Sequence, residues 1–185
     1  MPLTYPAARP TAGNVTLRAF ADTDLPLVAE LATDPYLPLI GTVPHPFTEA
    51  DGLAFLRRQQ QRLTDGTGYS FAVAELGSDR ALGTAGLWLR DREYGRCSAG
   101  YTVAPSARHR GVATAALAAL TGFAWTHSEL HRVELYIEPW NVGSTRVAER
   151  CGYRREGLLR SHTVIGGARR DMALYAAVRP EGLGA

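Results

Sequence analysis

Apolar and polar residues alternate with two different periods in the first third of the chain. Apolar side chains occupy every second position over residues 15–20, which predicts a strand. They recur at helical spacing over residues 22–32 and 48–63, which predicts two helices, and Thr48 is a plausible N-cap for the second. Residues 34–47 lie between them and contain four prolines and a glycine, so we expect a loop there.

The middle of the chain carries three strand-like runs, at residues 69–76, 81–90 and 96–104. Short polar turns separate them, and turns of this length join antiparallel neighbours, so these runs predict a meander. A helical pattern over residues 111–125 and an alternating run over 131–139 follow. A strand, a helix and a strand in this order predict a right-handed parallel crossover.

The last part of the chain predicts one more helix and a hairpin. Asn141 opens the helix as an N-cap, and Gly152 closes it. Two final strands flank Gly166–Gly167, a pair of residues typical of a tight hairpin turn.

The length of 185 residues suits a single domain with a sizeable core, which we place at residues 15–178. Residues 1–14 are rich in Pro, Ala and Thr and have no periodicity, so we expect a disordered tail, and residues 179–185 form a second tail. The hydrophobic content of 45% and the net charge of +2 are those of a soluble globular protein. This charge makes no case for nucleic-acid or membrane partners.

The cellular compartment follows from what the chain contains. Its only cysteines are Cys97 and Cys151, too few for a disulfide framework or a zinc cluster, and they favour a reducing compartment. We find no secretory signal pattern and no apolar run of roughly 18 residues that would span a membrane. These observations predict a cytoplasmic protein.

The most informative segment is "VAPSARHRGVATAAL", where a strand ends and a helix begins. Such a junction offers unpaired N–H groups and the positive end of a helix dipole, which together bind anions. Gly111 and Ala113 allow close approach to the backbone, and Arg108 and Arg110 carry donors suited to phosphate. The alternative is that Gly111 only starts a helix and the arginines are solvated. Neither G-x-x-x-x-G-K-[ST] nor a G-x-G-x-x-G after a strand is present.

This segment resembles the acetyl-CoA-binding signature of the GNAT acetyltransferase superfamily, [QR]-x-x-G-x-[GA], through Arg108, Gly111 and Ala113. The closing "GARRDMALYAAV" and the stretch before it are similar to the RimJ/RimL-like branch. The matching elements of that stretch are Asn141, Ser144, Gly152–Tyr153 and Glu156–Gly157. The resemblance spans about residues 15–178. It implies a mixed, mostly antiparallel sheet of about seven strands, flanked by about four helices, with a splayed parallel strand pair at the cofactor site.

The resemblance also implies roles for individual residues. The residues implied to contact acetyl-CoA are Thr102, Val103, Arg108, His109, Arg110, Gly111, Val112, Ala113, Thr114, Asn141 and Ser144. The pyrophosphate would bind the N–H groups of residues 109–114, and the backbone at 102–103 would hold the thioester carbonyl. Ser144 would protonate the departing thiolate, and Asn141 would contact the pantetheine or fix the start of its helix. Without a ligand, Asn141 is an ordinary N-cap and Ser144 a first-turn serine.

The chemistry requires a base, because an ammonium must lose a proton before it attacks a thioester. Relatives often carry Glu two residues before the Gly-Tyr of the fourth strand, and this chain has Ser98 there. Glu134 and Glu138 on the neighbouring strand are the next candidates, followed by Asp91 and Glu93. The sequence assigns none of them.

Two other patterns carry less weight. His127 and His131 are spaced as in a zinc helix, but Glu129 is misplaced for H-E-x-x-H, and we expect no metal. Cys97 has no local base, and the family transfers acetyl directly, so we expect this thiol to be packed.

The sequence therefore predicts an acetyl-CoA-dependent N-acetyltransferase acting on a primary amine, by analogy a protein N-terminal α-amine. The alternatives are a small-molecule acceptor, such as an antibiotic or a polyamine, and a CoA-binding module without catalysis. A homodimer is common among relatives. Recognition of the acceptor would depend on residues 33–47 and on the turns between strands, where the sequence pattern is least informative.

Overall fold

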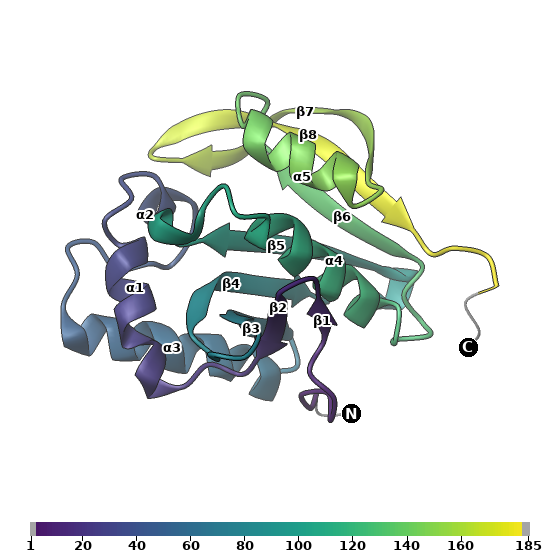
Figure 1. Cartoon of the computed structure of the whole chain (residues 1–185). Helices are drawn as coiled ribbons and strands as arrows, with labels where there is room; N and C mark the ends of the chain where they lie inside the picture. The colour runs from purple at the N-terminus through teal and green to yellow at the C-terminus, as the bar shows by residue number, and fades with distance from the viewer. Residues whose placement is uncertain (1–2, 183–185) are drawn as a thin grey trace.

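The computed structural model describes residues 3–182, which form one eight-stranded sheet and five α-helices (Figure 1). The strands are β1 (Thr11–Ala12), β2 (Val15–Arg18), β3 (Gly68–Glu75), β4 (Ala81–Trp88), β5 (Arg96–Val103), β6 (Arg132–Ile137), β7 (Arg154–Ile165) and β8 (Ala168–Val178). The helices are α1 (Leu25–Leu31), α2 (Leu37–Ile40), α3 (Glu49–Thr64), α4 (Val112–Ala124) and α5 (Val142–Arg150). This confirms the predicted fold class, with slightly more strands and helices than expected.

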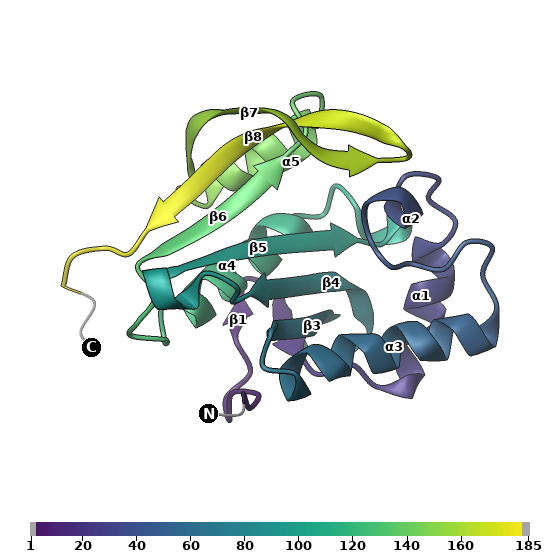
Figure 2. The ribbon, with the colours of Figure 1, turned by 180° about the vertical axis from the view of Figure 1, so that it is seen from behind.

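The strand order is β1-β2-β3-β4-β5-β6-β8-β7, and β5 with β6 is the parallel pair. This pair is short: its register runs from Arg96 opposite Arg132 to Ser98 opposite Glu134. Beyond these residues the two strands diverge, as Figure 2 shows. The predicted crossover and splay are therefore both present, and the splay opens toward the carboxyl ends of β5 and β6.

Helices cover both faces of the sheet. α4 packs against β2, β4 and β5 and against α5, while α3 packs against β3 and α1 on the other face (Figures 1 and 2). The predicted apolar stripe of α4 is confirmed, because each of its members is at most 5% exposed: Val112, Ala116, Leu120, Phe123 and Ala124. Among residues 3–182, no helix combines the length and the apolar character that a membrane span requires.

The N-terminal segment differs from the expected tail wherever it is described. The Tyr5 hydroxyl donates to the Ser70 carbonyl at 2.9 Å, and the Tyr5 ring meets Phe71 edge-on at 5.5 Å. Thr11–Ala12 adds the edge strand β1 to β2. A single aromatic anchor leaves no periodic pattern, which explains why composition alone predicts a tail. Met1, Pro2 and residues 183–185 lie outside the described part.

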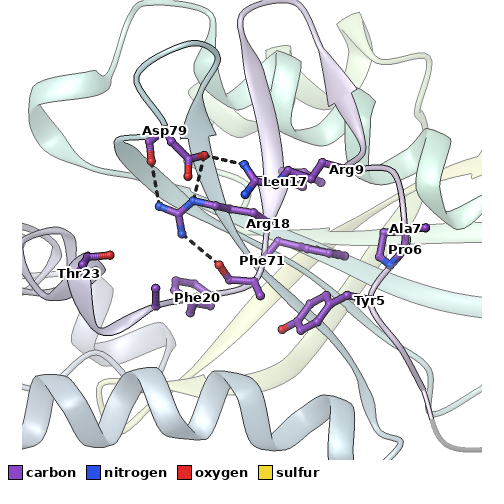
Figure 3. A pocket seen from close by; sticks show the side chains of 12 residues that line it. Tyr5, Pro6, Ala7, Arg9, Leu17, Arg18, Phe20, Thr23, Phe71 and Asp79 are labelled. Atoms are coloured by element: carbon purple, nitrogen blue, oxygen red, sulfur yellow. Dashed lines mark hydrogen bonds and ion pairs between the residues drawn. The ribbon is translucent and has the colours of Figure 1, made fainter.

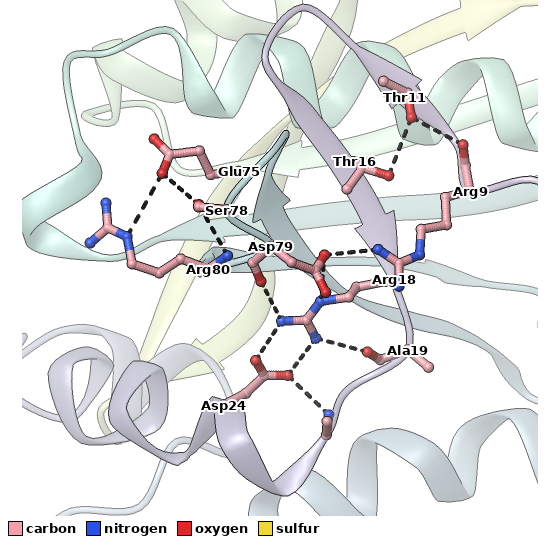
Figure 4. A network of polar contacts seen from close by, with 11 residues as sticks. Arg9, Thr11, Thr16, Arg18, Ala19, Asp24, Glu75, Ser78, Asp79 and Arg80 are labelled. Carbon is pink, nitrogen blue, oxygen red and sulfur yellow. Dashed lines mark hydrogen bonds and ion pairs between the residues drawn. The ribbon is translucent and has the colours of Figure 1, made fainter.

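A hollow of about 620 Å³ lies beside this segment and is lined in part by Tyr5, Phe20 and Phe71 (Figure 3). Arg18 also lines it, with a side chain only 9% exposed, and donates to both carboxylate oxygens of Asp24 at 2.7 Å. Asp79 adds a second carboxylate at 3.2 Å from Arg18 (Figure 4). Because the Arg18 charge is matched inside the protein, we read this network as an anchor for the N-terminal strands and not as the reaction site.

Candidate active site

The splay exposes one set of backbone groups of β5. Ala104 donates its N–H to Leu82 on β4 at 2.9 Å, and the carbonyl oxygen of Thr102 also lies against β4. Backbone groups alternate sides along a strand, so the N–H groups of Tyr101 and Val103 point into the splay. Of the predicted pair Thr102 and Val103, Val103 therefore has the N–H that faces the opening.

The loop between β5 and α4 has the shape of an anion cradle. His109 (φ 60°) and Gly111 (φ 77°) both adopt the left-handed conformation, which turns successive N–H groups into one concave surface. Within residues 3–182, no N–H of residues 109–114 has a hydrogen-bond acceptor, and the first bond belongs to Ala115, which donates to Gly111 at 3.0 Å. A Cβ at Gly111 would meet no protein atom within 4 Å, so the space in front of it is open.

The two arginines of this loop are engaged within the protein. Arg108 donates to the Asp34 carboxylate at 2.6 Å and, through Nε, to the Val103 carbonyl at 3.2 Å. Arg110 donates to Glu75 at 3.1 Å. The sequence suggested that both bring free charge to a phosphate, whereas here they fix the loop, and the N–H groups are what remain for an anion.

Asp34 also connects this loop to the segment expected to be irregular. Its Oδ1 accepts the N–H groups of Tyr36 and Leu37 at 2.8 and 3.2 Å, which starts α2 where the prolines predicted only a loop. Tyr36 in turn meets the ring of Trp140, beyond β6, edge-on at 5.1 Å. The segment after α1 therefore reaches from the loop that follows β5 to the loop that follows β6, across the open end of the splay.

The start of α5 completes the site. Asn141 Oδ1 accepts the N–H of Ser144 at 3.0 Å. Asn141 is therefore the N-cap of α5, as the sequence predicts for this residue without a ligand. The Ser144 hydroxyl makes no hydrogen bond within residues 3–182 and is partly buried. The Ser144 carbonyl accepts from the Tyr101 hydroxyl at 3.5 Å, which places Ser144 beside β5. Sequence reasoning missed Tyr101, and no local pattern pointed to this contact.

We expect Asn141→Ala to lower the free energy of unfolding by about 1 kcal/mol, because the Ser144 N–H loses its acceptor. Asn141→Asp keeps an acceptor in the same place and should retain most of the stability. Urea denaturation of the three proteins measures the difference, and an alanine variant as stable as the wild type would contradict the capping role.

Four carboxylates were candidates for the base. Asp91 and Glu93 lie in the exposed turn before β5. Glu134 is 6% exposed, but its oxygens accept from Arg132 Nε at 2.6 Å and from the Tyr136 hydroxyl at 2.8 Å. A carboxylate already bonded to two donors on its own strand is a structural group.

Glu138, the fourth candidate, is 7% exposed and accepts no hydrogen bond from the described residues. The nearest cation is Arg170, whose Nε lies 4.0 Å away. Glu138 is therefore a largely buried residue whose carboxylate oxygens, unlike those of Glu134, accept no hydrogen bond from residues 3–182 and are still reached by solvent.

The cysteines are packed. Cys97 is 2% exposed, and burial, together with the charge of Glu134, raises its pKa to about 12, so it stays a thiol at neutral pH. Cys151 donates its S–H to the Thr114 carbonyl at 3.4 Å. His127 packs against aromatic rings, and in the described part of the chain no three His, Cys, Asp or Glu side chains come together as a metal site.

Comparison with known proteins agrees with this geometry. The acetyltransferase (GNAT) domain family matches residues 14–154. The "Probable N-acetyltransferase YjcK" of Bacillus subtilis is 30% identical over 123 residues, which cover 66% of this chain and 68% of the relative. The chain therefore belongs to the GNAT acetyltransferase family, and it is an N-acetyltransferase.

Solved structures share the whole fold. A candidate ribosomal-protein-serine acetyltransferase from Vibrio cholerae has a TM-score of 0.79 at 21% identity, over 95% of this chain and 100% of that chain. Spermidine N-acetyltransferase from Vibrio cholerae, in complex with CoA and spermine, has a TM-score of 0.71 at 20% identity, over 89% of this chain and 95% of that chain. The fold is therefore compatible with both classes of acceptor.

Proposed function

We propose that this protein transfers an acetyl group from acetyl-CoA to the α-amine of a peptide or protein. The observation that supports acetyl-CoA as the acetyl donor is the row of unbonded N–H groups at residues 109–114. These groups lie at the start of α4 and beside the splay. These groups match a pyrophosphate, and the splay offers a path for the pantetheine between β5 and β6. The family supports the donor, since the spermidine enzyme of the same fold holds CoA.

In the proposed reaction, the N–H of Val103 stabilises the thioester oxygen as negative charge develops on it. The neutral amine attacks the carbonyl carbon, a C–N bond forms, and the C–S bond then breaks. The Ser144 hydroxyl gives its proton to the sulfur and regains one from the nitrogen. The products are an amide and free CoA thiol, with one proton released from the original ammonium.

A thiol-release assay over a panel of peptides and small amines tests this function. The chain has no lysine, so its side chains offer no primary amine, and acetyl-CoA alone should leave them unacetylated in a mass spectrum. Amine-dependent thiol release together with an acetylated product establishes the enzyme. Tight binding of acetyl-CoA without thiol release from any amine would favour the CoA-binding module.

For the acceptor, we expect peptides with a free α-amine to be acetylated with a higher kcat/KM than matched peptides whose only amine is a lysine side chain. An α-ammonium has a pKa of about 8 and a lysine ammonium one of about 10.4, so at pH 7 the α-amine supplies roughly 200-fold more free base. We expect at least a tenfold higher kcat/KM for the α-amine. A preference for the lysine amine, or activity only on polyamines or aminoglycosides, would overturn the acceptor and leave the fold and the donor site in place.

A further inference from the structure

Glu138 occupies a distinctive place in the fold. It follows directly after β6, and its carbonyl accepts the N–H of Asn141 at 2.9 Å, so it begins the turn that leads into α5. Neighbouring side chains of a strand point to opposite faces, which directs Glu138 away from the face of Ile137. Glu138 thus lies at the open end of the splay, one turn before the cap of the helix that carries Ser144.

The surroundings of Glu138 leave its carboxylate available to a ligand. The carboxylate oxygens of Glu138 accept no hydrogen bond within residues 3–182, and neither is sealed from solvent, so a ligand can reach them. Its one cation partner among residues 3–182, Arg170, has a side chain 51% exposed and stands at 4.0 Å, beyond hydrogen-bond length. An incoming donor can therefore replace this weak pairing at little cost to the fold.

A hollow of about 390 Å³ opens in front of Glu138 and is also lined by Trp140 and Arg170. The Trp140 indole is 60% exposed in spite of its contact with Tyr36. An unbonded carboxylate at the edge of a hollow, beside an exposed indole, is a combination that can bind an alkylammonium, through an ion pair and a cation–π contact. Both groups come from the short turn that ends at Asn141, so a ligand bound here adjoins the start of α5.

The other charged and titratable groups around this hollow have partners of their own. On β8, Asp171 accepts the N–H of Ser161 at 2.7 Å, and Arg169 donates to the carbonyl of Ser161 at 3.3 Å. On the Glu138 side of β6, the carboxylate of Glu134 is bonded as described above, and the ring of Tyr136 stacks on His162 of β7. This leaves Glu138 as the carboxylate without a hydrogen bond among these groups.

We propose that Glu138 binds the acceptor ammonium and takes its proton, in place of the carboxylate that β5 lacks at Ser98. This inference rests on the proposed function. The ammonium first forms an ion pair with Glu138, and one N–H proton then passes to the carboxylate, which leaves a neutral amine and a carboxylic acid. The amine attacks the thioester, and the acid returns its proton to solvent.

Glu138→Gln tests this role, because glutamine keeps the size of the side chain and cannot take a proton. At pH 7 we expect kcat/KM for a peptide α-amine to fall by roughly 100-fold, with the affinity for acetyl-CoA unchanged. The deficit should shrink toward pH 9.5, where solution supplies the free amine. Glu149→Gln is the matched control, since Glu149 is exposed on α5 and its side chain makes no hydrogen bond or ion pair within residues 3–182, and it should behave as wild type.

The outcomes separate the explanations. A Glu138→Gln protein that acts within twofold of wild type at pH 7, or one with the same deficit at every pH, would overturn the proton-transfer role and leave the proposed function in place. If the glutamine variant fails to fold, Glu138→Asp decides: it should keep the wild-type pH profile at a reduced rate, and a changed profile would contradict the role. A wild-type protein that acetylates no amine would refute the proposed function itself.

Discussion

Gly111→Asp should abolish the binding of acetyl-CoA. The Cβ of residue 111 would project into open space in front of unbonded N–H groups, where we place the pyrophosphate. A carboxylate there repels the phosphates and competes for the same N–H groups, and at a few ångströms this repulsion amounts to several kcal/mol. We expect the affinity to fall by roughly 100-fold or more, measured by calorimetry on the folded variant.

Gly111→Asn provides the control for shape and strain. Gly111 has φ +77°, a conformation that asparagine tolerates better than most side chains, and asparagine matches aspartate in size without the charge. It should bind acetyl-CoA more weakly than wild type but far better than the aspartate variant. Equal affinity of the aspartate variant and the wild type would remove the anion site from this loop.

Much of the fold can be predicted from the sequence because its signals are local. The apolar stripe of α4, the Thr48 cap of α3 and the Gly166–Gly167 turn each depend on residues within a few positions of one another. The parallel crossover follows from the order of strand, helix and strand, and the splay beside it is implied by the resemblance to the GNAT family. These features need no knowledge of distant partners.

The interactions that hold the site together could not be predicted in this way. Arg108 pairs with Asp34, 74 positions away, and Arg110 pairs with Glu75, 35 positions away. A sequence shows that an arginine precedes a helix, but it does not show which carboxylate will neutralise it. As a result, the sequence suggests that the arginine side chains bind phosphate together with the backbone N–H groups, whereas in the structure the arginines are paired with carboxylates and the N–H groups stay unbonded.

The same reasoning applies to the choice of a base. Glu134 and Glu138 are equivalent in sequence, since both are acidic, lie on one strand pattern and stand four positions apart, on the same face of a strand. The structure buries both to a similar degree and distinguishes them by their partners alone. The oxygens of Glu134 already accept hydrogen bonds from Arg132 and Tyr136, so they are not available to a substrate. Glu138 has no such bonds within residues 3–182 and can accept a donor from a ligand.

Ser144→Ala should reduce turnover by at least tenfold and leave the affinity for acetyl-CoA nearly unchanged. The Ser144 hydroxyl makes no hydrogen bond within residues 3–182. It lies in the first turn of α5, which the hydrogen bond from Tyr101 holds against β5. Protonation of the thiolate matters only as the C–S bond breaks, so its loss affects kcat and not the binding of the donor. Single-turnover thiol release, with affinity from calorimetry, separates the two effects.

Ser144→Thr keeps a hydroxyl and serves as the matched control, so it should recover more of the turnover than alanine does. The N–H of residue 144 still donates to Asn141 in both variants, which keeps the helix start intact. Wild-type turnover in the alanine variant would reduce Ser144 to a helix residue. The Tyr101 hydroxyl, whose pKa is raised by burial and which therefore stays protonated, would then be the next donor to test, as Tyr101→Phe.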